Sequence, residues 1–297
     1  MSGQARILTV SVICGFFVIV FLGTVPSKGF GTNPNAQRGE QCELLSSISD
    51  PKAAVLEPQN TWSNFGYLVV GGLILYRSRN LLGAAVGLNL AFEFLFSGLY
   101  HAKLTDAMQT IDVAWIYVLL LSVIAYAIQS LFLRDWAKKT GYPTFTAPVL
   151  IAVAIVLVVV GLGVVMGLLK NSIFESTKTT LALVGLLFVL LIIAGVVVAM
   201  RGAEHAAIHL VMTTLVILAA GIPTLFFKFS DGAGNSLLFF PNLCCPKADL
   251  QAHAAWHILS AVMVGIAYDF FANFSGDGRL FSFSRPMQEF EISSEAV

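Results

Sequence analysis

Long apolar segments separated by short polar ones run through most of the chain. A membrane-spanning helix needs about 20 apolar residues, and seven segments from residue 61 onward approach or reach that length. The apolar positions are continuous rather than alternating, which excludes a transmembrane β-barrel. We therefore expect an all-α polytopic membrane protein, a seven-transmembrane-helix bundle with spans at Thr61–Tyr76, Leu81–Tyr100, Val113–Leu133, Val149–Leu169, Thr179–Met200, Leu210–Phe227 and Leu250–Phe271.

An additional apolar segment, Ile7–Val25, follows Arg6 near the start of the chain. Its apolar core of about 17 residues is longer than the 7–15 residues of a typical signal-peptide core, and no A-x-A cleavage site follows it. We expect an extra N-terminal helix retained as a signal anchor, and the alternative is a cleaved signal peptide. The predicted organisation is 1–25 for the anchor or signal peptide, 26–56 for an outer loop, 57–273 for the seven-helix membrane domain and 274–297 for a flexible tail.

The composition narrows the class of protein further. Hydrophobic residues make up 57% of the chain and charged residues only 11%, against about 25% charged residues in soluble domains. The 17 basic residues equal the 17 acidic ones in number, so no basic surface for nucleic acid is expected. We expect a multi-pass integral membrane protein without a nucleic-acid partner, in a membrane that the sequence does not identify.

The five histidines are the main candidates for chemistry, and four of them form two H-x-x-x-H pairs, His205 with His209 and His253 with His257. A spacing of four residues places both rings of a pair on one helix face, where they can share a metal ion. One such pair alone is weak evidence, because histidine pairs on helices are more often structural.

The order of the spans separates the two pairs. The end of an even span and the start of an odd span lie on the same side of the membrane, so His101, Asp112 and the His253–His257 pair are predicted to share one side. His205 and His209 begin the sixth span on the opposite side, and we interpret that pair as structural.

A polar face on the second span supports a site at this position. Glu93, Ser97 and His101 follow one another at intervals of four residues, so they share one face that must point into the bundle. Three neutral imidazoles favour zinc with an open fourth position, with Asp112 accepting a proton from the water and Ser97 donating to an oxyanion. Such a site would hydrolyse a lipid amide or ester; a hydrogen-bonded seam, a proton relay and another metal remain open.

These residues together resemble the alkaline ceramidases, in the superfamily that includes the adiponectin-type receptors. The resemblance covers roughly Gln41 to Phe271 and leaves Ile7–Val25 outside. Three motifs carry it: Glu57…Asn60-Thr61-x-Ser63-Asn64, Ser97-x-x-x-His101…Asp112 and His253-x-x-x-His257.

The resemblance implies a zinc-dependent hydrolase acting on linear amide C–N bonds inside the membrane. It implies zinc on His101, His253 and His257, with Asp112 and Ser97 as catalytic residues. The implied substrate is ceramide or a related N-acyl sphingoid lipid, split into a sphingoid base and a fatty acid.

The resemblance also implies two features of the outer loops. One is a calcium site, for which Glu40, Glu43 and Glu57 are the candidate oxygen ligands. The other is a disulfide from Cys42 to Cys244 or Cys245, with free thiols as the alternative.

Two other classes of function stay open from the sequence. One is a seven-helix receptor-type membrane protein in which the zinc is structural. The other is a transporter or a haem-binding membrane protein that uses the histidine pairs as ligands.

Overall fold

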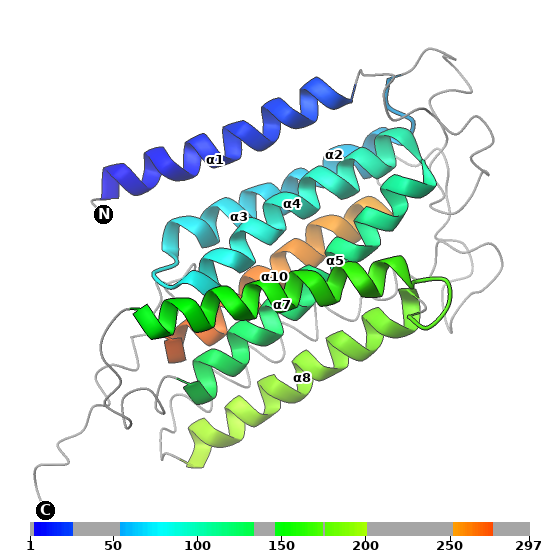
Figure 1. Ribbon diagram of the computed structural model, residues 1–297. Helices are drawn as coiled ribbons and strands as arrows, with labels where there is room; N and C mark the ends of the chain where they lie inside the picture. The colour runs from blue at the N-terminus through cyan, green and yellow to red at the C-terminus, as the bar shows by residue number, and fades with distance from the viewer. Residues whose placement is uncertain (1–2, 26–53, 134–145, 175, 201–251, 276–297) are drawn as a thin grey trace, which may run out of the picture.

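The computed structural model describes residues 3–25, 54–133, 146–174, 176–200 and 252–275, and its regular elements there are all helices. The helices run alongside one another as an elongated bundle (Figure 1), with α1 along one side and α8 along the other. Their bounds are α1 Gly3–Thr24, α2 Pro58–Ser63, α3 Phe65–Arg77, α4 Leu81–Lys103, α5 Asp106–Ile128, the π-helical turn η3 Gln129–Leu133, α7 Thr146–Leu168, α8 Ser176–Met200 and α10 Ala252–Ser275.

Five of these helices, α1, α4, α5, α7 and α10, are long and apolar enough to cross a membrane. The expected all-helical membrane architecture is thus confirmed in its coarse form. The count of seven bundle helices stays a prediction, because the expected span Leu210–Phe227 lies outside the described residues.

The first expected span differs from the prediction, because it is not one uninterrupted helix. α2 ends at Ser63 and α3 begins at Phe65, with Asn64 between them in a right-handed helical conformation. The Tyr67 amide donates to the Asn64 carbonyl at 2.9 Å, which is the tighter three-residue spacing of a 3₁₀ turn. The two helices follow one another along the chain. At 1.5 Å per helical residue, Pro58 to Arg77 would extend about 30 Å, the thickness of the hydrocarbon core.

A tight hairpin between α4 and α5 sets the position of His101. Leu104 ends α4 with a positive φ of 51°, the only such non-glycine residue in the described parts of the chain. Thr105 then caps α5 by accepting from the Met108 amide. Because α5 turns back at once, His101 near the end of α4 and Asp112 in the second turn of α5 lie at the same end of the bundle.

Glycines allow two of the helix pairs to approach closely. Gly163 and Gly167 form a G-x-x-x-G face on α7 that packs on Ala114 and Val118 of α5: an added Cβ at Gly167 would lie 2.6 Å from the Ala114 Cα. Small residues of this kind permit backbone contact between membrane helices. The same device joins α3 to α4 at Gly71, where a Cβ would lie 2.7 Å from a carbonyl oxygen.

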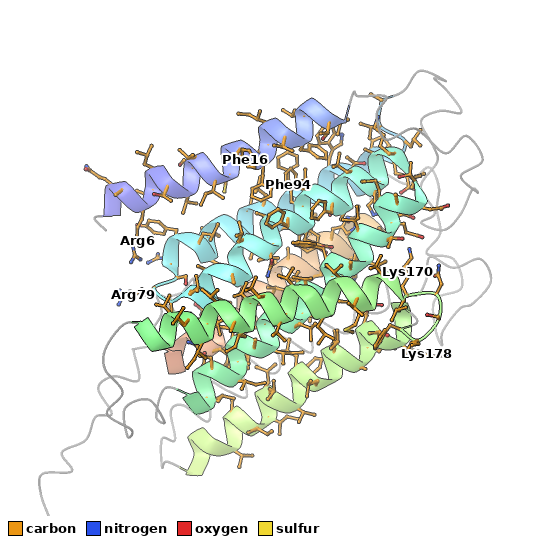
Figure 2. The ribbon with its side chains drawn as sticks, in the orientation of Figure 1. Arg6, Phe16, Arg79, Phe94, Lys170 and Lys178 are labelled. Carbon is orange, nitrogen blue, oxygen red and sulfur yellow. The ribbon has the colours of Figure 1, made fainter. Side chains whose placement is uncertain are left out.

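Charged side chains mark the two ends of the bundle. Figure 2 shows Arg6 and Arg79 at one end and Lys170 and Lys178 at the other. The Arg6 guanidinium donates to the Ser78 carbonyl at 3.5 Å, so the start of α1 lies beside the turn that follows α3. The apolar length of the bundle between these charges is what a bilayer requires.

The N-terminal helix α1 packs on the bundle through two phenylalanines. Phe17 and Phe21 are buried, while most other large apolar side chains of α1 are exposed. Phe21 makes ring contacts with Trp62, Phe65 and Phe94, and Figure 2 shows Phe94 on the side of the bundle that faces α1. A helix with one packed stripe and one exposed apolar face is typical of the outermost helix in a membrane bundle.

The contact between Phe21 and Gly98 yields a test of this packing. A Cβ at Gly98 would lie 2.9 Å from the Phe21 ring, which is enclosed by other aromatic rings. We expect Gly98→Ala to destabilise the protein by about 1–3 kcal/mol, the usual cost of overpacking. In a Phe21→Ala background the same change should be neutral or stabilising, because alanine favours a helix over glycine.

The measurement is thermal unfolding, in one detergent, of the wild type, Gly98→Ala, Phe21→Ala and the double variant. The matched control is Gly161→Ala on α7, where an added Cβ meets nothing within 4 Å. Equal destabilisation by Gly98→Ala with and without the Phe21 ring would show that α1 does not pack here.

Candidate metal centre

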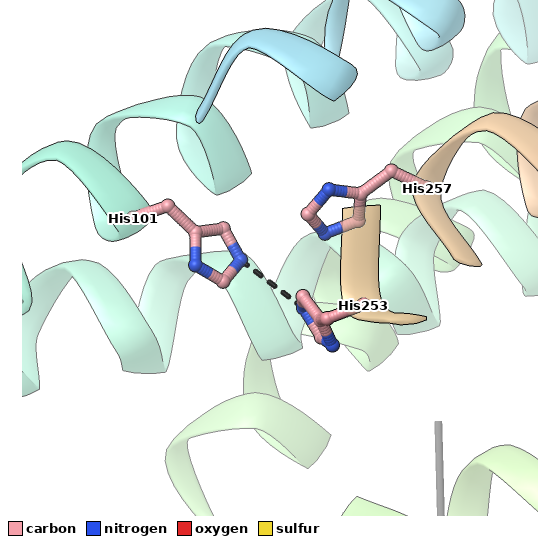
Figure 3. A group of neighbouring side chains, drawn as sticks. All are labelled: His101, His253 and His257. Atoms are coloured by element: carbon pink, nitrogen blue, oxygen red, sulfur yellow. Dashed lines mark hydrogen bonds between the residues drawn. The ribbon is translucent and has the colours of Figure 1, made fainter. Parts of the chain in front are cut away.

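Three histidines from two distant parts of the chain meet at one end of the bundle. His101 comes from α4, and His253 and His257 come from the first turns of α10. One ring nitrogen of each lies within 4.8 Å of the others, and all three side chains are buried. Figure 3 shows the three rings gathered together. The structure thus confirms the sequence prediction that these three residues form one group.

The spacing of the nitrogens fits a shared metal ion. The Nε2 atoms of His101 and His253 are 3.2 Å apart, and Figure 3 shows the two rings pointing toward one another. Two nitrogens bound at 2.0–2.1 Å to a tetrahedral ion lie about 3.3 Å from each other. This distance therefore requires little rearrangement for both to bind the same ion.

The carboxylate of Glu57 fixes the orientation of His101. Glu57 Oε2 lies 2.7 Å from His101 Nδ1 and also accepts from the Asn60 side-chain amide at 3.2 Å. A carboxylate accepts hydrogen bonds, so Nδ1 carries the proton and Nε2 keeps its lone pair for a metal. This carboxylate–histidine pair is the usual outer partner of a metal ligand.

Backbone hydrogen bonds hold Glu57 in place against α4. The Glu57 amide donates to the His101 carbonyl, and the Leu56 amide donates to the Ala102 carbonyl, both at 3.1 Å. The last carbonyls of a helix have no partner within it. The segment before α2 supplies partners here, so it is aligned with the turn of α4 that carries His101.

Aromatic rings surround the three histidines. Tyr100 lies 4.9 Å from His101 between ring centroids, and Trp256 lies 5.2 Å from each of His253 and His257. Tyr67 lies 6.0 Å from His257, and its hydroxyl bonds to Ser260 at 2.6 Å. An apolar shell of this kind limits access of water and strengthens electrostatic interactions inside it.

A chain of hydrogen bonds connects three helix ends beside these aromatic residues. The buried ammonium of Lys170 donates to the Gln109 side chain at 2.8 Å, and Gln109 donates to the Tyr100 hydroxyl at 3.3 Å. The turn after α7, the start of α5 and the end of α4 are thereby joined around the histidine group.

The other predicted site residues are buried near this group but outside it. Asp112, Ser97 and Glu93 are 7%, 1% and 1% exposed. Ser97 and Glu93 precede His101 on α4 by one and two turns, and Asp112 lies in the second turn of α5. Neither carboxylate belongs to the ligand group that the described residues form, so the catalytic roles of Asp112 and Ser97 stay predictions.

Several predicted residues lie outside the described parts of the chain. Of the three candidate calcium ligands, Glu57 contacts His101, and Glu40 and Glu43 are among those outside. The calcium site therefore stays a prediction. The disulfide of Cys42 with Cys244 or Cys245 also stays a prediction, because these residues lie outside the described parts of the chain. The structural role of the second pair, His205 and His209, stays a prediction for the same reason.

Sequence reasoning missed the tyrosine and serine that pack beside His257. Helical spacing contained the signal: Tyr67 follows Ser63 by four residues, and Ser260 follows His257 by three. Tyr67 is therefore expected on the same helix face as Ser63, and Ser260 on the same face as His257.

The Glu57–His101 pair predicts an effect on metal affinity. We expect Glu57→Ala to weaken Zn²⁺ binding about 10–100-fold, because the outer partner of a ligand tunes its basicity and orientation. Competition with a chelator in detergent measures this. The matched control is Glu93→Ala, which removes a buried carboxyl two turns before His101 on α4. An equal loss in both variants would contradict the specific role of Glu57.

Comparison of the chain with protein-family models, with curated proteins and with solved structures finds no match.

Proposed function

We propose that the protein is a zinc-dependent intramembrane hydrolase that cleaves the amide bond of ceramide or a related N-acyl sphingoid lipid. The observation that carries the proposal is the group of three buried imidazoles, with one Nε2 pair 3.2 Å apart. The resemblance of the three sequence motifs to the alkaline ceramidases supports the choice of substrate.

The donor set favours a transition metal such as zinc over calcium or magnesium. Neutral imidazole suits zinc, copper, iron and nickel, whereas calcium and magnesium prefer oxygen. Three protein ligands with an open position are typical of catalytic zinc, and structural zinc sites are usually closed by four. The described residues supply three ligands, which supports a catalytic site over the structural zinc of a receptor-type protein.

A zinc ion held by these residues would supply Lewis acidity toward water and the scissile carbonyl. The chain would supply the groups that handle protons. Asp112 is the proposed proton acceptor, since it is a buried carboxylate at the same end of the bundle. Ser97 lies one turn before His101 on the same face of α4 and is the proposed donor to the oxyanion.

The depth of the site suits a lipid amide. His101 is two residues from the last residue of α4, and His253 is the second residue of α10. His101 and His253 therefore lie within about one turn of their helix ends, and His257 lies one turn further in, close to where the hydrocarbon core gives way to headgroups. Trp62 on the adjacent α2 is 45% exposed, and tryptophan is enriched at this interface.

The geometry disfavours a haem held between His101 and His253, whereas the second histidine pair lies outside the described residues. Two axial nitrogens on opposite sides of one iron must be about 4 Å apart, twice a bond of 2.0 Å. His101 and His253 are closer than this, and their rings meet at 60° with 4.9 Å between centroids. A porphyrin does not fit between them.

The proposal predicts the behaviour of a ligand variant. We expect His253→Ala to lower bound zinc from one ion per chain to a small fraction and to reduce ceramide hydrolysis to background, because two imidazoles hold the ion far less tightly than three. Metal analysis of the purified protein and mass spectrometry of a panel of N-acyl lipids measure the two effects.

The control is His205→Ala, in the pair interpreted as structural, which should retain both zinc and hydrolysis. Turnover retained by a well-folded His253→Ala variant would reject the proposal. A wild-type protein that unfolds on removal of zinc, yet hydrolyses no amide when loaded, would support the receptor-type interpretation instead.

A further inference from the structure

A single serine on α2 stands between two partners beside the metal centre. Ser63 Oγ lies 2.9 Å from the Asn60 carbonyl oxygen and 2.8 Å from His257 Nδ1. A serine hydroxyl has one proton, so it can donate to only one of these two atoms. The direction of this one proton decides which nitrogen of His257 is available to a metal.

The two directions have opposite consequences. If Ser63 donates to Asn60, its oxygen accepts from His257, Nδ1 carries the ring proton and Nε2 has the lone pair. If Ser63 donates to His257 Nδ1, a neutral ring carries its proton on Nε2 and cannot bind a metal through that atom.

The geometry around Asn60 favours the first direction. A serine that donates to the carbonyl three residues earlier follows the common local pattern of helices. The Asn60 carbonyl also accepts from the Asn64 side chain at 2.7 Å, and a carbonyl oxygen accommodates two hydrogen bonds. Donation from Ser63 therefore completes this acceptor without displacing Asn64.

We propose that Ser63 is a positioning residue for the metal centre, which accepts the Nδ1 proton of His257 and so directs the Nε2 lone pair of that ring to the ion. The inference rests on the proposed metal centre but not on the proposed substrate. It assigns to His257 the kind of outer partner that Glu57 provides for His101.

The short helix α2 thereby connects the outer partners of two ligands from different helices. The Asn60 side-chain amide donates to Glu57 Oε2, and the Asn60 carbonyl accepts from Ser63. A continuous path runs from His101 through Glu57, Asn60 and Ser63 to His257. The order of donors and acceptors along it leaves a lone pair on Nε2 of both rings.

The test compares Ser63→Ala with Ser63→Thr. Loss of the hydroxyl should weaken Zn²⁺ affinity about 10–100-fold, measured by chelator competition on the full chain in detergent. Threonine keeps the hydroxyl and should restore affinity to within about threefold. The absorption bands of bound Co²⁺ provide a second readout, because they respond to the ligands around the ion and not to overall stability.

The matched control is Ser130→Ala. Ser130 is also buried and donates to a carbonyl one turn earlier, that of Tyr126, but it lies in η3, which follows the far end of α5. This variant should bind Zn²⁺ as the wild type does, and circular dichroism should show equal helix content in all variants.

Several outcomes would overturn the inference. Unchanged affinity in Ser63→Ala would remove Ser63 from the metal centre, and tighter binding would indicate the opposite proton direction. Loss in Ser63→Thr as large as in Ser63→Ala would point to packing rather than hydrogen bonding. A wild-type chain that takes up no Zn²⁺ overturns both this inference and the proposed function, whereas a zinc-loaded chain without amidase activity overturns only the function.

Discussion

The close approach of imidazole nitrogens inside an apolar bundle is the constraint on which the site depends. The nearest pair, on His101 and His253, is 3.2 Å apart, and all three rings are buried. Lone pairs facing one another in a medium of low dielectric repel, and a cation between them turns that repulsion into binding. The outer partners Glu57 and Ser63 favour lone pairs on Nε2, so the chain is organised for a cation rather than for a hydrogen bond between rings.

The fold meets this constraint through features that do not touch the metal position. The positive φ of Leu104 ends α4 directly after the turn of His101, which allows the backbone before α2 to bond to that turn. The break at Asn64 then separates the polar helix α2 from the apolar α3. α1 covers this region, because Phe21 contacts both Trp62 of α2 and Gly98 of α4.

The features that can be predicted from the sequence are those that depend on helical spacing and on the order of the spans. The histidine group was predictable, because span order alone places His101, His253 and His257 on one side of the membrane, and helical spacing aligns the last two. The break at Asn64 was not, because an apolar run predicts the length of a span but not its hydrogen-bonding pattern. The contact of Glu57 with His101 also required the structure, since a carboxylate before a helix is equally typical of a calcium ligand or a favourable helix start.

Two glutamates that are buried in the described part of the bundle, Glu57 and Glu93, lie in different surroundings. Glu57 is near the bundle end, and its carboxylate faces an imidazole that can donate to it. Glu93 lies at the middle of α4, 1% exposed, where ionisation in hydrocarbon is costly. Asn89, one turn away on α4, donates to Ser122 of α5 at 2.6 Å. A polar face therefore runs inward along α4 from His101 through Ser97 to Glu93, and its side chains are buried inside the bundle.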